Sequence, residues 1–507
     1  MATYIMSTSS RVIKNTAYLY AKMGITMFVS LYTTRLILSS LGASDFGIFN
    51  VVGGAISMLG FLNSTMANAT QRFMSFAEGE GKIETKRKIF NVSMVLHLAI
   101  AAITVFILII AMYPLFNGVL NIEPNRVSAA IVIYLSLVFS TVLTIINVPY
   151  DAVMNAHENM LYYSIVGIFE SMLKLAVAFC CVYTKGDKLI VYGMLMAFIP
   201  LITLSIMKVY CHRRYKECII APRHYWDVSL VKSIAKFFGW NFLTAISSLF
   251  SAQGISIVLN HYYGTVLNAS QGIANQLNGM LSSFSLNMKK ALNPVIAKSA
   301  GAGNLNTMNQ AAIWGCKYSA LLTMFFSIPL SLEIGYVLRI WLKVVPMWAT
   351  TFVVFQLITT IIEQMAGSAS AAIYALGDIK HYAIWKSVMN ASPVLITLYA
   401  FHMGGSPIWV YIPMIVVWAI GGDIVMIYFA KRKCGFSVLE YIRQVVLPLC
   451  TIALSMLICG CLSLYFFEEG LVRLLMTCAL TTSGMGIAGM LFLTNKERAY
   501  LQQFVGR

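Results

Sequence analysis

Apolar runs of about 20 residues recur along the whole chain, separated by short polar connections. A helix needs about 20 such residues to span the hydrocarbon core of a bilayer, so the pattern predicts an all-α integral membrane protein with about fourteen transmembrane helices. No connection is long enough to hold a folded soluble domain. The predicted spans are approximately 12–38, 46–72, 89–112, 128–148, 161–183, 189–208, 236–260, 266–288, 312–335, 348–372, 382–402, 407–430, 446–467 and 471–493.

Four of these spans carry polar residues at intervals of three and four, which places them on one face of each helix. They are the spans 46–72, 128–148, 266–288 and 348–372. Small polar residues also hold packed membrane helices together, and for a single helix that would be the simpler explanation. An amide that faces lipid without a partner is costly, however, and four long stripes exceed what packing needs. We interpret them as walls of a hydrated central cavity.

Ionisable residues inside the spans are a second signal, because a charge at mid-membrane costs about 2.5–3.5 kcal/mol and normally faces a cavity or a partner. Arg35, Lys317 and Lys386 lie near predicted span ends, where a long side chain can reach the interface. Glu170 and Lys174 are one helical turn apart. They are coupling candidates, and a structural ion pair is the alternative.

Glu363 lies near the middle of its span, which contains no basic residue. A carboxylate in such a place can exchange a proton or hold a cation while a transport cavity alternates between sides. Glu363 is therefore the leading coupling candidate, with H⁺ or Na⁺ as the coupling ion. The alternative is a structural pair with a basic residue of another helix, for example Lys22.

The predicted cavity is net basic and rich in amides and hydroxyls. Amides and hydroxyls suit sugar hydroxyl groups, while Lys and Arg suit phosphate oxygens. The expected substrate therefore has a polar, phosphorylated head, whereas a cationic drug would need acidic and aromatic walls. The candidate cavity residues are Lys22, Arg35, Asn68, Arg72, Asn275, Asn278, Lys289 and Lys290.

Composition agrees with a surface that faces lipid. The 507 residues are 59% hydrophobic and 11% charged, whereas soluble domains carry about 25% charged residues. The net charge of +17 comes from Lys and Arg gathered in alternate loops, about two thirds of them on one side of the membrane. This asymmetry predicts that both termini are cytoplasmic. The basic loops are short and lack interleaved aromatic residues, which argues against nucleic-acid binding.

The sequence shows no motif for catalysis or for a resident cofactor. The ten cysteines lie mostly inside apolar spans, and their spacing indicates neither disulfides nor zinc. The first apolar run contains Lys22 and lacks a small-residue cleavage site, so no cleavable signal peptide is expected. We expect no catalytic residues, no metal and no enzymatic activity.

The two halves of the chain repeat each other. Six predicted helices separate equivalent points, so the halves have the same orientation, and a central site would lie at their interface. The matched glycines, 222 residues apart, are Gly42 with Gly264, Gly79 with Gly301, and Gly81 with Gly303. The predicted domains are a first lobe (1–210), a cytoplasmic linker (211–235), a second lobe (236–432) and a final helix pair with a tail (433–507).

The segment 33–81, with Arg35 and the run Leu-Gly-Ala-Ser-Asp-Phe-Gly-Ile-Phe (Leu41 to Phe49), resembles bacterial polysaccharide-biosynthesis flippases. These belong to the multidrug/oligosaccharidyl-lipid/polysaccharide exporter superfamily, which includes the MATE drug exporters. The two six-helix lobes, the run GYVLRIWL (335–342) and the final helix pair also match, so the resemblance covers nearly the whole chain. Arg35 and Asp45 match the family's charged pair around the first turn, and Arg72 matches a basic position at the end of the second helix. Asp45 thereby joins the coupling candidates.

The resemblance implies a MATE-like fold that works by alternating access in the bacterial inner membrane. It implies an undecaprenyl-pyrophosphate-linked oligosaccharide, such as an O-antigen or lipopolysaccharide precursor, as the substrate. Membrane lipids and other polysaccharide-assembly proteins would be its partners. A MATE-type drug or cation antiporter of the same fold is the main alternative. A membrane polymerase or ligase is less favoured, because the longest outer loops hold only about 15 residues and no catalytic motif.

Overall fold

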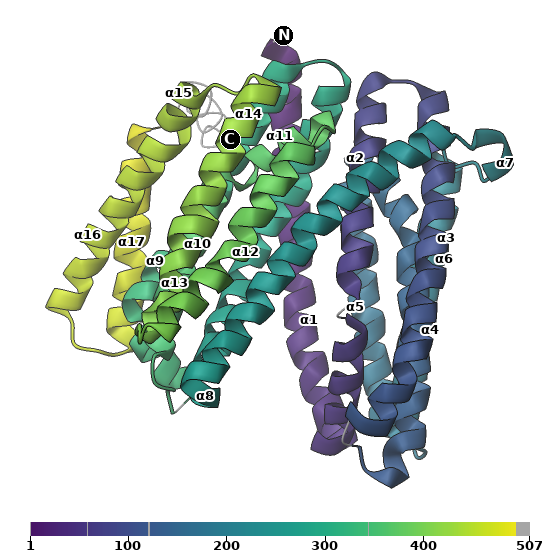
Figure 1. Cartoon of the computed structure of the whole chain (residues 1–507), viewed down its shortest axis with the longest axis horizontal. Coiled ribbons are helices and arrows are strands. Elements are labelled where there is room, and N and C mark those ends of the chain that lie inside the picture. The colour runs from purple at the N-terminus through teal and green to yellow at the C-terminus, as the bar shows by residue number, and fades with distance from the viewer. Residues whose placement is uncertain (1, 58, 120–121, 343, 493–507) are drawn as a thin grey trace. The chain divides into compact units, whose positions relative to one another are not determined.

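The computed structural model describes residues 2–57, 59–119, 122–342 and 344–492. These residues form helices joined by short connections, and no strand occurs among them (Figure 1). The α-helices are α1 (Ala2–Ser57), α2 (Gly60–Glu80), α3 (Ile83–Pro114), α4 (Val127–Ala156), α5 (Met160–Tyr183), α6 (Lys188–Arg214), α7 (Pro222–Tyr225), α8 (Val228–Gly301), α9 (Leu305–Leu342), α10 (Ala349–Gly367), α11 (Ala369–Leu376), α12 (Lys380–His402), α13 (Tyr411–Pro413), α14 (Gly422–Cys434), α15 (Val438–Tyr441), α16 (Leu447–Phe466) and α17 (Leu471–Leu491). Short 3₁₀ segments (Pro124–Arg126, Pro407–Val410) and π segments (Leu115–Val119, Met414–Gly421, Ile442–Val446) extend some of them.

Within these residues, eleven helices are long and apolar enough to cross a membrane, or twelve if one bent pair counts as a span. The predicted all-α membrane fold is confirmed, and the predicted number of spans is roughly consistent with it. Predicted boundaries differ where a span is broken or fused. The predicted span 46–72 is divided, because Ser44–Ser57 and Gly60–Glu80 meet at a bend of 48°. The predicted spans 236–260 and 266–288 both lie inside α8.

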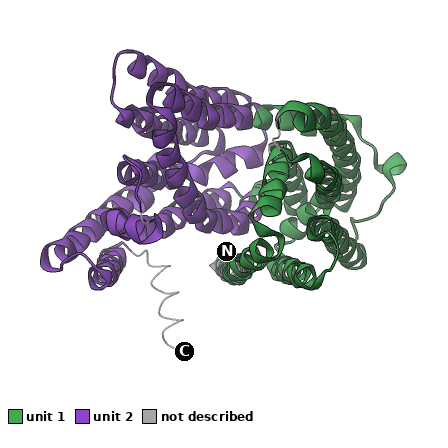
Figure 2. Cartoon of the chain, turned by 90° about the horizontal axis from the view of Figure 1, so that it is seen from below, with its two compact units in different colours: residues 1–242, 297–304 green, residues 243–296, 305–507 purple. Residues whose placement is uncertain are grey.

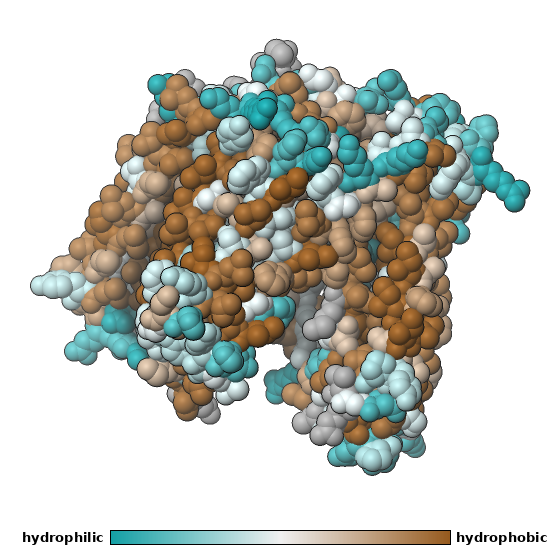
Figure 3. Space-filling model, in the orientation of Figure 1, coloured by the Kyte–Doolittle hydropathy of each residue, from teal (hydrophilic) through white to brown (hydrophobic). Residues whose placement is uncertain are grey.

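The surface has the distribution expected of a protein in a bilayer. Figure 3 shows apolar residues along the lengths of the helices and polar residues gathered at helix ends. The final helices illustrate this, since Leu454, Ile458 and Leu475 are all more than half exposed. Exposed leucines and isoleucines of this density are stable where lipid is the solvent. The chain is therefore a multi-pass membrane protein.

The chain forms two compact units, shown in Figure 2. Unit 1 comprises residues 1–242 and 297–304, and unit 2 comprises residues 243–296 and 305–507. The long helix α8 thus contributes to both, and its last turn belongs to unit 1. The expected linker 211–235 lies within unit 1, and the domain limits given above remain predictions.

The repeated glycines adopt equivalent backbone conformations. Gly42 breaks α1 at φ 80° and Gly264 breaks α8 at φ 77°, with ψ near 180° at both. Gly81 and Gly303 also match, at φ 72° and 71°. Positive φ is strained for residues with a Cβ, so the sequence needs glycine at these four places. The equivalence supports the predicted internal duplication.

A second glycine pair brings two repeat-equivalent segments of unit 1 into contact. A Cβ on Gly79 would overlap the carbonyl oxygen of Lys298, and one on Gly301 would overlap the carbonyl oxygen of Phe76. Lys298 lies 222 residues after Phe76, as Gly301 does after Gly79, so the two contacts are reciprocal. Such an exchange of roles is typical of an isologous contact between like elements.

In unit 2, an ion pair and a hydrogen bond connect the final helix pair to α9. The guanidinium of Arg473 on α17 binds both oxygens of Glu333 on α9, each at 2.9 Å, and Thr477 donates to the same carboxylate at 2.9 Å. Glu333 is 1% exposed. A bidentate, fully satisfied pair in a low-dielectric interior fixes the orientation of α17 on α9.

Candidate functional site

Unit 1 contains a cavity of about 160 Å³ between α1, α4, α5 and α6. Its polar lining includes Lys22 from α1, Asn147 and Asp151 from α4, and Tyr163 and Glu170 from α5. These donors and acceptors come from three helices, so tertiary packing assembles them. The cavity combines one cation with two carboxyl groups and an amide, a lining that can bind either charged or hydroxylated groups.

Lys22 is held in this cavity by α5. Its ammonium lies 4.1 Å from the centroid of the Tyr163 ring, a cation–π contact. Gly167, one turn further along α5, faces the lysine stem, and a Cβ there would overlap Cε. The glycine therefore makes room for Lys22, which lies away from the helix ends, as expected of a cavity residue.

The predicted pair of Glu170 and Lys174 forms, with Oε1 and Nζ 2.7 Å apart. Both side chains are more than a third exposed. The contact agrees with the structural alternative, because partly exposed pairs one turn apart stabilise a helix only slightly. Their role in coupling remains a prediction.

Arg72 of α2 is surrounded by aromatic rings. Its guanidinium carbon lies 4.5 Å from the ring centroid of Phe73, 4.9 Å from that of Phe76 and 5.6 Å from that of Phe237. Phe237 belongs to the first turns of α8, which are part of unit 1. Guanidinium groups stack favourably on aromatic faces, so the three rings fix the direction of this side chain.

The remaining nominated residues are not gathered in one place. Arg35 and Asn68 in unit 1 and Asn275 in unit 2 are exposed, whereas Lys290 is half-buried. Asn278 is engaged within unit 2, where its Oδ1 accepts from Thr360 of α10 at 2.6 Å. For Asn278 the structure therefore shows helix-to-helix contact, the packing alternative of the polar stripes.

Asp45 pairs with Arg126, a residue that the sequence analysis did not nominate. Arg126 precedes α4 and binds Asp45 in bidentate fashion, and it also binds Asp187 at 2.7 Å. Asp187 additionally caps α6 by accepting from the backbone of Leu189. Burial alone would raise the pKa of Asp187, but the hydrogen bond and charge of Arg126 hold it below its usual value. This network connects the start of α4 with the start of α6 and with Asp45 of α1, at one end of unit 1.

Inside unit 2, Trp418 lies beside two charged side chains, Glu363 and Lys386. The indole N–H of Trp418 donates to Oε1 of Glu363 at 2.7 Å. The Lys386 ammonium lies 5.7 Å from the same indole ring. Lys289 lies against the same helix, α10, one turn beyond Glu363, where a Cβ on Gly367 would be 2.6 Å from its Nζ.

Asp423 completes this unit 2 charge cluster (Lys289, Glu363, Lys386 and Asp423, with Trp418). Its neighbour Gly422 faces the ammonium of Lys386, and a Cβ there would lie 2.5 Å from Nζ. Lys386 Nζ and Asp423 Oδ1 are buried, and neither has a hydrogen-bond partner among the described residues. Both acids act electrostatically on both lysines. The cluster is charge-balanced, which is how a membrane interior tolerates four charges.

For Lys386 and Lys317 the structure does not favour the alternative in which the side chain reaches the membrane interface. Their residues are only 8% and 5% exposed, so both lie inside unit 2. Asp423 was missed altogether. The sequence does contain a signal for Asp423, because a charged residue inside an apolar run is a candidate functional residue. Asp423 lies inside the run 407–430, just as Glu363 lies inside its own span.

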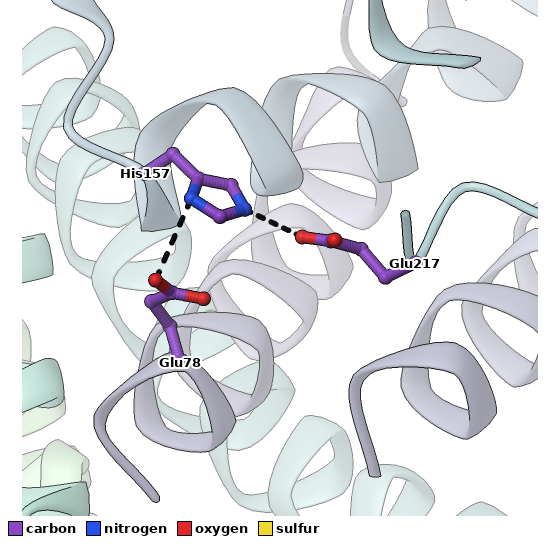
Figure 4. A group of neighbouring side chains, drawn as sticks. All are labelled: Glu78, His157 and Glu217. Atoms are coloured by element: carbon purple, nitrogen blue, oxygen red, sulfur yellow. Dashed lines mark hydrogen bonds and ion pairs between the residues drawn. The ribbon is translucent and has the colours of Figure 1, made fainter. Parts of the chain in front are cut away.

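A second charged cluster lies at the opposite end of unit 1 from Arg126. Figure 4 shows the ring of His157 between the carboxylates of Glu78 and Glu217, with an interaction from each ring nitrogen. Within the described part of the chain, these are the His, Cys, Asp and Glu side chains grouped closely enough to share an ion, with donor atoms within 4.8 Å. Lys86 already occupies one oxygen of Glu78 at 2.7 Å. We therefore interpret the cluster as an ion-pair network.

Comparison with known proteins defines the fold. No family model matches the sequence, and no curated protein matches it. Solved structures do match. A MATE family transporter of the MOP superfamily in an outward-facing conformation has a TM-score of 0.72 at 14% identity, covering 84% of this chain and 96% of that one. A structure described as MATE in the bent conformation has a TM-score of 0.70 at 14% identity, covering 84% and 96%.

A MOP superfamily transporter from Pyrococcus furiosus Vc1 (DSM3638) also matches, with a TM-score of 0.65 at 14% identity, covering 83% of this chain and 96% of that one. Its description reads "Reverse polarity of binding pocket suggests different function". All three similar structures are of transporters, and none is of an enzyme. At this level of identity the likeness concerns the fold. The protein is a multi-pass membrane protein with the fold of the MATE transporters of the MOP superfamily.

Proposed function

We propose that the protein is a flippase that moves an undecaprenyl-pyrophosphate-linked oligosaccharide across the bacterial inner membrane for surface polysaccharide biosynthesis. It would work by alternating access, with both termini cytoplasmic. The observation that carries the proposal is that each unit holds at least two of the basic side chains inside its membrane helices. They are Lys22 and Arg72 in unit 1 and Lys289 and Lys386 in unit 2.

The chemistry of these groups suits a pyrophosphate. The guanidinium of Arg72 is pre-oriented by three rings, and a planar fork binds phosphate oxygens in bidentate fashion. Lys22 lies in a cavity with Asn147 and Tyr163, whose amide and hydroxyl groups can bind sugar hydroxyls. The lipid tail would stay in the bilayer, and the apolar outer faces of α16 and α17 are compatible with it.

A drug or cation antiporter is the second candidate, and specific observations favour it. Glu363 and Asp423 are acids inside unit 2, and Glu363 lies beside the indole of Trp418, which is a suitable wall for an organic cation. The matched structures described as MATE transporters share this fold. We favour the flippase because Lys289 and Lys386 already balance these acids. A MOP transporter of similar fold is described by a reversed polarity of its binding pocket, which is compatible with this choice.

Transport in proteoliposomes tests the proposal. The purified protein would be reconstituted with an undecaprenyl-pyrophosphate-linked oligosaccharide in both leaflets, and periodate added outside would oxidise only the outer sugars. A flippase delivers the inner pool to the oxidant, so the protected fraction should disappear. A parallel uptake assay with a fluorescent organic cation measures the alternative. Persistent protection of the glycan together with cation uptake would overturn the flippase in favour of the antiporter.

Coupling is proposed to run through Glu363, with H⁺ or Na⁺ as the ion. Asp45, Glu170 and Lys174 are weaker candidates, since each already has a charged partner close by. No resident cofactor is proposed. Other polysaccharide-assembly proteins are the proposed partners in the cell.

A further inference from the structure

Five segments of unit 1 converge on His157. Glu78 lies near the end of α2, His157 and Glu158 form the turn between α4 and α5, and Glu217 lies in the connection from α6 to α7. Lys86 of α3 and Lys298 of the last turn of α8 complete the set. We call these six residues the histidine cluster. The basic loops nearby place it on the side that we propose to be cytoplasmic.

The ring of His157 touches a carboxylate at each nitrogen (Figure 4). Nε2 lies 2.5 Å from Oε1 of Glu217, and Nδ1 lies 3.5 Å from Oε1 of Glu78. A neutral imidazole donates from one nitrogen and presents a lone pair at the other, which would face a carboxylate oxygen unfavourably. The arrangement therefore fits a ring that carries both protons.

The charges of the cluster lead to the same protonation state. Glu78, Glu158 and Glu217 supply three negative charges. Lys86 binds Glu78 at 2.7 Å, and Lys298 lies 3.8 Å from Glu78 and 3.6 Å from Glu158. Two ammonium groups against three carboxylates leave one negative charge, and a protonated His157 neutralises it. Unbalanced charge is costly here, because the side chain of Glu217 is only 3% exposed.

The surroundings hold the ring in this place. Tyr215 stacks on the imidazole, with centroids 4.3 Å apart and planes inclined by 11°. The Tyr215 hydroxyl in turn accepts a hydrogen bond from Asn159 at 3.0 Å. Glu158 has a left-handed backbone at φ 55°, which is uncommon for a residue with a side chain. Backbone hydrogen bonds close this turn, since Glu158 N donates to Asn155 O at 2.9 Å and Asn159 N donates to Met154 O at 3.1 Å.

We propose that the histidine cluster is a proton-dependent latch, in which doubly protonated His157 bridges Glu78 and Glu217 and keeps this end of unit 1 closed. When the ring loses a proton, one carboxylate loses its partner and Glu217 must become hydrated. The end of α2, the turn 157–159 and the connection 215–221 then separate. The bridge needs a proton on both ring nitrogens, so a rise in cytoplasmic pH would release the latch.

The latch lies beside the reciprocal contact of Gly79 and Gly301. Lys298 uses its backbone carbonyl against Gly79 and its ammonium near Glu78 and Glu158. Separation of the ends would therefore expose both helix termini, 76–81 and 297–304, to water. A role of the latch in a transport cycle rests on the alternating access proposed above. Opening and closing of the latch can be measured without any substrate.

Hydrogen–deuterium exchange of the full chain in lipid nanodiscs tests the latch. Protection is the observed rate compared with the intrinsic rate at the same pH, which removes the intrinsic pH effect. We expect protection of 76–81, 155–160 and 215–221 to fall about tenfold or more between about pH 6 and about pH 9. The reason is that losing a charge-assisted hydrogen bond changes the equilibrium constant for local opening by about a factor of ten or more. His157→Gln should show the low protection at both pH values.

The exposed His224, in the nearby helix α7, provides the matched control, and His224→Gln should keep the wild-type profile. Glu217→Gln is the second variant, should His157→Gln fail to fold, and it should abolish the pH dependence of 155–160. Wild-type protection at both pH values in either of these cluster variants would overturn the latch. A zinc ion that co-purifies with the wild type and is absent from His157→Gln would also overturn it, because the ring would then be a metal ligand.

Discussion

Trp418 donates its indole N–H to the carboxylate of Glu363 at 2.7 Å, and this bond orients the leading coupling candidate. The bond needs only an acceptor oxygen on residue 363. Glutamine supplies the same oxygen without the charge. The two roles open to Glu363, ion coupling and charge compensation, can therefore be separated by one isosteric change.

We expect Glu363→Gln to fold and to bind substrate but to lose the dependence of transport on an ion gradient. The test is transport in vesicles under imposed pH and sodium gradients. If Glu363 instead only balances Lys289 and Lys386, the variant should lose stability, and the double variant Glu363→Gln/Lys386→Met should regain it. A wild-type rate under every gradient would remove Glu363 from the coupling mechanism.

Arg72→Ala should abolish flipping while leaving the amount of protein in the membrane unchanged. A charge-assisted contact to phosphate is worth about 1.5–3 kcal/mol, so substrate binding should weaken about tenfold or more. Arg72→Lys should recover part of the activity, since an ammonium keeps the charge but not the planar fork. The exposed loop residue Lys82 gives the control, Lys82→Ala. Full activity of Arg72→Ala would show that Arg72 does not bind the pyrophosphate.

Gly301→Ala should destabilise unit 1, because the new Cβ would overlap the carbonyl oxygen of Phe76. Overpacking of this kind costs about 1–3 kcal/mol. Gly79→Ala should behave alike, since its contact is the reciprocal one. Gly239→Ala is the control, for it lies in α8 with open space around it and should be neutral or slightly stabilising. Thermal unfolding in detergent compares the three variants, and equal melting temperatures would contradict the close contact.

The acid side of the histidine cluster also has a predicted pH dependence. Burial by itself would raise the pKa of Glu217, but the hydrogen bond and charge of His157 lower it overall below its ordinary value of 4.5. A lowered folded-state pKa means that this carboxylate stabilises the protein fully above its ordinary pKa, and the contribution disappears as the pH falls through the folded-state value. Melting temperatures measured downward from about pH 6 should therefore fall more steeply for the wild type than for Glu217→Gln. Parallel curves would show that the pair adds no stability.

Topology is tested by cysteine labelling in a background without reactive native thiols. Gly186 lies between α5 and α6, and Arg223 lies in α7, and both are exposed. Gly186→Cys should react with an impermeant thiol reagent in intact cells, and Arg223→Cys should react only after permeabilisation. The reverse pattern would invert the proposed orientation and place the histidine cluster outside the cytoplasm.

Hydropathy by itself determined the class of this protein and the approximate places of its helices. Every apolar run must satisfy its backbone hydrogen bonds within itself in lipid, so a local pattern suffices to predict a helix. The matched glycines were visible for a related reason. Gly42 and Gly264 have φ values of 80° and 77°, which residues with a Cβ rarely adopt.

Only the tertiary structure decided which charges meet. Asp45 pairs with Arg126, 81 residues away. Glu363 and Lys386 both lie against Trp418, and His157 lies between two carboxylates from different segments. Charged side chains are long and interact across helices, so their partners depend on helix rotation and packing, which a linear pattern does not contain. The sequence thus identified the intramembrane charges as a class, while packing assigned them to a cavity, a balanced cluster and a latch.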